Sequence, residues 1–222
     1  MPDAPLALTN ERLKTPRAAA LAGILFALLY SGSIVIIRLS VPRDLADHGA
    51  WLRERAGSVT FALRLVPFAG IAFLWFMGVV RDRIGYLEDQ FFSTVFYGSG
   101  LLFLAMTFVS AALAGGLLAT QAAEAGRLID SGLYTLMRAV MLRITSTYAA
   151  KMAGVFMISL ATIALRTRVM PRWLTVGSYV VALGLLLSIG ASLWVVLLFP
   201  AWVCVVSVYI LVSNLRRRPV GP

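Results

Sequence analysis

The chain has 222 residues, of which 60% are hydrophobic and only 14% are charged, and its mean hydropathy is +0.86. Soluble domains carry about 25% charged residues, so this composition excludes an ordinary soluble domain and is typical of a protein whose main solvent is lipid. The net charge is +10. The arginines flank apolar segments and form no separate basic domain, which argues against a nucleic-acid partner and favours anionic membrane lipids.

Apolar segments of membrane-spanning length recur along the chain. Because a helix crosses a hydrocarbon core of about 30 Å in about 20 residues, we expect six transmembrane helices. They lie near residues 17–38, 59–80, 92–118, 147–166, 173–189 and 191–213. The last two form one uncharged run about twice as long as a single span needs, so we expect it to fold back as a helical hairpin.

The same segments lack the two-residue alternation of a transmembrane β-barrel. The sequence therefore predicts an all-α integral membrane protein, a bundle of about six transmembrane helices. A single transmembrane domain covers residues 17–215. It lies between a cytoplasmic N-terminal tail, 1–16, and a basic cytoplasmic C-terminal tail, 216–222.

Basic residues near short loops predict the orientation in the membrane. They flank the first helix, the link between the fourth and fifth helices and the C-terminus: Arg12, Lys14, Arg17, Arg166, Arg168, Arg172, Arg216, Arg217 and Arg218. With an even number of spans, both termini are expected to be cytoplasmic. A five-span arrangement with one terminus outside is the alternative. The dominance of Arg over Lys in an Ala- and Gly-rich chain favours a bacterial plasma membrane.

The two longer outer loops are expected to contain short interfacial helical segments. Between residues 131 and 147, Leu133, Leu136 and Val140 recur at helical spacing. This pattern predicts either an interfacial helix or an extension of the fourth span above the membrane. The stretch 43–56, which includes Trp51, shows a weaker pattern of the same kind.

Small residues form faces on three of the predicted spans. They lie within a narrow arc of the helical wheel and comprise Gly23, Ala27, Tyr30 and Ser31 in the first span, Gly100, Thr107, Ala111 and Ala114 in the third, and Gly177, Gly184 and Ser188 in the fifth. Such faces allow close helix packing in lipid. The alternative interpretation is that they line a narrow path or a contact between subunits.

The fourth span carries a polar stripe that includes Lys151 and Thr162. Together with Arg64 in the second span and Arg38 at the end of the first, Lys151 could form a basic ring near the outer leaflet. Such a ring would suit an anionic headgroup or solute. The alternative is that these side chains are anchors that extend to the membrane surface.

The predicted cytoplasmic loop between the second and third spans is charged. Glu88 and Asp89 precede a helix and suit the positive end of its dipole, whereas Arg81 and Arg83 follow one. One interpretation is a well-capped helical hairpin. The other is a docking loop for a cytoplasmic partner.

Recognisable catalytic patterns are absent from the sequence. His48 is the only histidine, all acidic residues fall in predicted loops or tails, and no phosphate-binding loop or nucleophile motif occurs. We therefore expect no metal or other cofactor and no enzymatic activity. The leading hypothesis is a non-enzymatic subunit or scaffold of a membrane complex, whose partners are membrane lipids and either further copies of this chain or other membrane subunits. A permease or channel that acts as an oligomer is the alternative, followed by a lipid-modifying enzyme.

Overall fold

The computed structural model describes residues 15–42, 49–84, 90–168, 170–188 and 193–216. This part of the chain is helical and contains no strand. Its elements are α1 (Thr15–Ser40), α2 (Trp51–Glu54), α3 (Ala56–Ile84), α4 (Gln90–Asp130), α5 (Leu133–Arg143), the π-helix η2 (Ile144–Ala149), α6 (Ala150–Thr167), α7 (Arg172–Leu187), α8 (Leu193–Val196) and α9 (Leu198–Arg216). The predicted all-α membrane bundle is confirmed.

Five helical stretches in the described part of the chain are long and apolar enough to cross a membrane: Ala20–Ser40, Ala56–Arg81, Phe91–Ala123, Leu133–Thr167 and Trp194–Ser213. The sixth expected span corresponds to α7, which is apolar but has only 16 residues. At 1.5 Å per residue it is about 24 Å long, which is less than the thickness of a typical hydrocarbon core.

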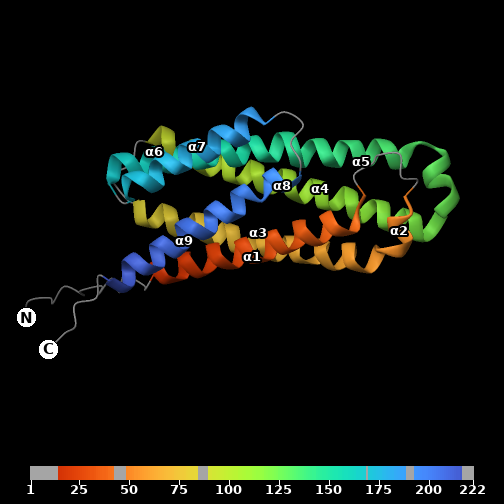
Figure 1. Cartoon of the computed structure of the whole chain (residues 1–222), viewed down its shortest axis with the longest axis horizontal. Helices are drawn as coiled ribbons and strands as arrows, with labels where there is room; N and C mark the ends of the chain where they lie inside the picture. The colour runs from red at the N-terminus through yellow and green to blue at the C-terminus, as the bar shows by residue number, and fades with distance from the viewer. Residues whose placement is uncertain (1–14, 43–48, 85–89, 169, 189–192, 217–222) are drawn as a thin grey trace, which may run out of the picture.

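The helices run nearly parallel to the long axis of the molecule (Figure 1). At one end, here called the near end, α1 begins, α9 finishes, α3 gives way to α4, and α6 gives way to α7. At the opposite end, here called the far end, α2 lies beside the turn from α4 to α5. Gly132 makes that turn with φ +70°, a conformation that favours glycine. The assignment of the near end to the cytoplasm stays a prediction.

The fourth span is longer than a membrane requires. Helix α5 continues through η2 into α6, so residues 133–167 form one helical column of about 52 Å. Of the two possibilities for the segment 131–147, the structure shows the extension of the fourth span. The stretch 43–56 contains the single helical turn α2.

The two long helices of the uncharged run pack against different helices of the bundle. Helix α7 packs mainly on α6, whereas α9 packs mainly on α1. One hydrogen bond joins the pair directly, from Trp202 Nε1 to Ser178 Oγ at 2.8 Å. The two helices of the expected hairpin therefore contact each other much less than they contact α6 and α1.

Aromatic rings form the core in the middle of the bundle. Phe26 of α1, Phe73 of α3, Phe103 of α4, Phe156 of α6 and Phe199 of α9 are all buried. Ring centroids of Phe26 and Phe73 are 4.7 Å apart, as are those of Phe103 and Phe199. These separations are typical of favourable aromatic pairs. Five helices thus meet at one interlocking cluster.

The predicted small-residue faces have different roles. A Cβ on Gly23 would collide with the side chain of Ser207, and a Cβ on Gly100 would lie 2.6 Å from Met77 Sδ, so both glycines allow close helix contact. Gly177 and Gly184 on α7 have no atom of another helix within 4 Å of the Cβ position, in the part of the chain that is described. The close-packing prediction is confirmed for Gly23 and Gly100 but not for the α7 glycines.

Candidate binding site at the far end of the bundle

A cavity of about 80 Å³ lies among α1, α3, α4, α5 and η2. Most of its lining is aliphatic, but five side chains carry hydroxyl groups: Tyr30, Ser33, Thr107, Ser110 and Thr145. We call this space the hydroxyl cavity. None of its lining residues is charged. The cavity adjoins the aromatic core, because Tyr30 lines the cavity and its ring stacks on that of Phe26. The two ring centroids are 5.3 Å apart.

The hydroxyl groups of the cavity are bonded to the protein itself. Ser33 Oγ donates to the carbonyl oxygen of Ala62 at 2.9 Å, and Thr107 Oγ1 donates to the carbonyl oxygen of Phe103 at 2.9 Å. Ser110 Oγ and Thr145 Oγ1 are 2.7 Å apart. The first of these bonds ties α1 to α3, and the last ties α4 to η2. They also leave the cavity with a largely satisfied, mainly apolar surface.

The small residues of α4 explain why the cavity exists. Thr107, Ala111 and Ala114, three of the four members of its predicted small-residue face, line the hydroxyl cavity, whereas Gly100 packs against a neighbouring helix. The same face of α4 therefore packs against another helix at one position and lines the cavity further along the helix. The cavity also borders the π-helix η2 through Thr145. Such wide turns are rare and frequently occur at functional sites.

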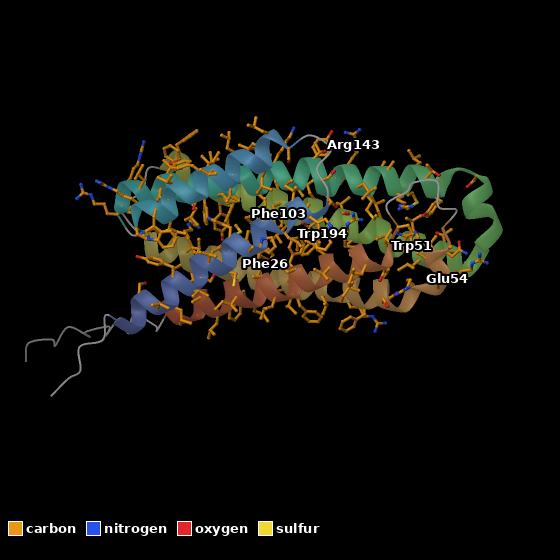
Figure 2. All side chains as sticks on the ribbon, in the orientation of Figure 1. Phe26, Trp51, Glu54, Phe103, Arg143 and Trp194 are labelled. Carbon is orange, nitrogen blue, oxygen red and sulfur yellow. The ribbon has the colours of Figure 1, made fainter. Side chains whose placement is uncertain are left out.

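A second and more open pocket of about 470 Å³ lies at the far end, outside the hydroxyl cavity. Arg38 from the last turn of α1, Arg55 and Glu54 give it a polar lining with an excess of positive charge. Trp51 and Trp194 provide flat apolar walls. We call this space the basic pocket. Figure 2 shows Trp51 and Glu54 toward the far end, with Trp194 between them and the central Phe26 and Phe103.

Trp51 borders both spaces and is held in place by hydrogen bonds. The indole lines both the cavity and the pocket and is buried. Its Nε1 donates to Tyr134 Oη at 2.9 Å, and Nη1 of Arg138 donates to the same oxygen at 2.8 Å. Nη2 of Arg138 donates to the carbonyl oxygen of Pro42, which lines the basic pocket. These bonds connect α2, α5 and the end of α1.

Arg138 is an unusual member of this network because only 1% of its surface is exposed. Burial of a charged group is costly unless hydrogen bonds compensate for lost water. Its guanidinium also lies 5.7 Å from the ring centroid of Tyr134, within the range of a cation–π contact. A buried guanidinium thus lies behind the wall of the basic pocket.

The four candidate anion contacts expected from sequence lie in different places. Arg38 lines the basic pocket, whereas Arg64 is exposed on α3 and Lys151 is half-buried on α6. Thr162 lies toward the near end, where its hydroxyl is 2.7 Å from that of Tyr179 on α7. Only Arg38 of the four lines either of the two spaces described here. Whether any of them binds an anion stays a prediction.

Part of the polar stripe of the fourth span, which also includes Gly154 and Ser159, contacts α7. Besides the contact of Thr162 with Tyr179, a Cβ on Gly154 would lie 3.1 Å from the carbonyl oxygen of Ala182. Ser159 is buried, and its hydroxyl donates to the carbonyl oxygen of Val155 in its own helix. The stripe therefore contributes two contacts to the interface between α6 and α7.

The candidate partner loop falls mostly outside the described part of the chain. Glu88, Asp89 and the side chain of Arg83 are not described. Arg81 is exposed, and its guanidinium lies 5.2 Å from the ring centroid of Tyr97 at the start of α4. Arg166 makes a similar contact with Phe92 at 4.7 Å. At the near end, arginines thus lie over aromatic rings of α4.

Sequence reasoning did not identify Trp51, Tyr134 or Arg138 as site residues. The spacing of Tyr134 and Arg138 places them on one face of a helix, but nothing in that spacing indicates that the arginine is buried. Trp51 is separated from Tyr134 by 83 positions, so their contact has no local signal.

The described residues contain no group of three or more His, Cys, Asp or Glu side chains arranged to hold a metal ion. The far end contains two adjoining spaces, the mainly apolar hydroxyl cavity and the basic pocket. Comparisons with protein-family models, with curated proteins and with solved structures found no match to the chain.

Proposed function

We propose that this multi-pass membrane protein is non-enzymatic and binds a molecule carrying a phosphate or carboxylate group in the basic pocket. The observation that carries the proposal is the convergence of Arg38 and Arg55 on a pocket of about 470 Å³. Arginine suits such groups because its planar guanidinium can donate two parallel hydrogen bonds to them. Glu54 in the same lining would orient the anion toward the arginines by repelling it.

The location of the pocket supports a role at the membrane surface. Arg38 is in the last turn of α1 and near the end of the candidate span Ala20–Ser40. Arg55 immediately precedes α3. Positions at the ends of spans lie at the level of the lipid headgroups. Trp51 and Trp194 in the lining fit that level, because tryptophan is enriched at membrane–water interfaces.

Binding to purified protein in phosphatidylcholine nanodiscs tests the proposal. Phosphatidylglycerol doped into the discs serves as a lipid probe and is counted by native mass spectrometry, while glycerol phosphate serves as a soluble probe. Replacing either arginine, Arg38→Gln or Arg55→Gln, removes charge-assisted hydrogen bonds. Each variant should bind both anions about tenfold more weakly.

The matched control is Arg53→Gln, since Arg53 is an exposed arginine of α2 that does not line the pocket. It should retain the affinity of the unmodified protein. If Arg53→Gln weakens binding as much as Arg38→Gln does, attraction to the general surface charge explains the affinity, and the proposal fails. The same holds if the pocket variants bind both probes normally.

The expectation of a subunit or scaffold in a membrane complex stays a prediction, and α7 is the helix on which to test it. Trp173, Val180 and Leu187 are each about two-thirds exposed on its outer side. Lipid or another protein covers this face in the membrane. Cross-linking from Val180→Cys in a Cys204→Ala background would detect a second copy of the chain. A dimer band would support self-association, and labelling by lipid-soluble maleimide alone would oppose it.

A further inference from the structure

The hydroxyl cavity and the basic pocket share part of their walls. Val41 and Trp51 line both spaces. The volume of the hydroxyl cavity, about 80 Å³, is well above the roughly 10–15 Å³ that one water molecule needs. A molecule that occupies the pocket therefore has a second compartment beside it.

The two compartments have opposite polarity. Ser33, Thr107 and Ser110 already bond to groups of the protein, and no charged residue lines the cavity. Water inside would find few partners, and cavities of that kind favour apolar occupants. The basic pocket carries two arginines and one glutamate. An occupant of both would need one apolar part and one anionic part.

We propose that the far end binds an anionic lipid, with the headgroup in the basic pocket and part of an acyl chain in the hydroxyl cavity. This inference rests on the proposed function and names its ligand class. Lipid tails already provide an apolar solvent, so burial alone gives the chain little advantage over the bilayer. The advantage comes from filling a space whose walls otherwise lack contacts.

Trp51 is the residue that positions the lipid at the junction. Its indole forms the shared wall, and its bond to Tyr134 fixes the ring orientation. Arg138 bonds both Tyr134 and the carbonyl of Pro42 in the pocket lining. Arg138 therefore helps to set the geometry of the wall.

Closing the cavity tests the inference. Ala111 lines the cavity, whereas its neighbour Ala112 is exposed on the outer side of α4. Ala111→Leu should weaken binding of lysophosphatidylglycerol about tenfold, because the added side chain takes the place of the acyl chain. It should leave glycerol phosphate binding unchanged. Ala112→Leu is the matched control and should bind both probes normally.

The outcomes separate this inference from the proposed function. Equal lysophosphatidylglycerol affinity in Ala111→Leu and Ala112→Leu would overturn the acyl-chain assignment, and a free anion would then be the occupant. Normal binding of both probes by Arg38→Gln would overturn the proposed function itself. Ala114→Leu, at another lining position on α4, provides a second cavity-filling variant if Ala111→Leu fails to fold. It should show the same selective loss.

Discussion

The middle of the bundle and its far end are built differently, although α1, α3 and α4 run through both. In the middle, Phe26, Phe73 and Phe103 bury their rings against one another. A few turns further along the same helices, alanines and short hydroxyl side chains leave a cavity. Tyr30 marks the boundary between the two regions. The same helix can therefore pack tightly in one part of the bundle and line a cavity in another.

The largest expected effect concerns the aromatic core. Phe73→Ala removes a ring that is completely buried and touches four other rings of the cluster. The free energy of unfolding should fall by about 3–5 kcal/mol, because a cavity replaces dense packing. Titration with sodium dodecyl sulfate measures this quantity in micelles. Phe68→Ala on the exposed side of α3 is the control, and equal losses would refute a specific aromatic core.

An intermediate effect on stability is expected from the hydrogen bonds that hold Trp51 at the wall of the cavity. Tyr134→Phe removes the oxygen that accepts hydrogen bonds from both Trp51 and Arg138. The unfolding free energy should fall by about 1–3 kcal/mol, since buried donors lose a partner. Tyr148→Phe, at an exposed position of η2, should change it little. A neutral Tyr134→Phe would show that this network contributes no stability to the far end.

A smaller effect on stability is expected from two substitutions on the same face of α4, and only one of the two should be destabilising. A Cβ on Gly100 would lie 2.6 Å from the flexible side chain of Met77, so Gly100→Ala should destabilise the protein by about 1 kcal/mol through overpacking. Ala111→Leu extends into the cavity and should be neutral or stabilising. Thermal unfolding followed by circular dichroism compares the two. A larger loss for Ala111→Leu would mean that the far end is as tightly packed as the middle.

The smallest effect is expected on α7, which belongs to neither region. Among the described residues, no atom of another helix lies within 4 Å of the position that a Cβ on Gly177 would take. Gly177→Ala should therefore stabilise the helix by less than about 1 kcal/mol, through its higher helix propensity. The same thermal unfolding measurement applies. A clear loss of stability would show that another chain packs against this face in the intact protein.

Local patterns in the sequence predict the helices well and the site poorly. Apolar length identifies each long span, because every backbone group in lipid must be bonded within its own helix. Counting apolar residues also predicts a span for 173–189, whereas α7 ends at Leu187 and has only 16 residues. Among the candidate site residues, Arg38 reaches the basic pocket from the last turn of its helix. The other lining residues come from 39–42, from 50–55 and from Trp194, and no local pattern indicates that these segments converge.

Composition and apolar length are sufficient to predict a helical membrane bundle, since they decide which structures lipid permits. The small-residue face of α4 is also visible in the sequence, although which of its members pack against a helix and which line a cavity is not. The meeting of Trp51, Tyr134 and Arg138 is visible only in the folded chain. It requires α2 and α5, which are far apart in the sequence, to lie side by side, and that arrangement depends on packing among several helices.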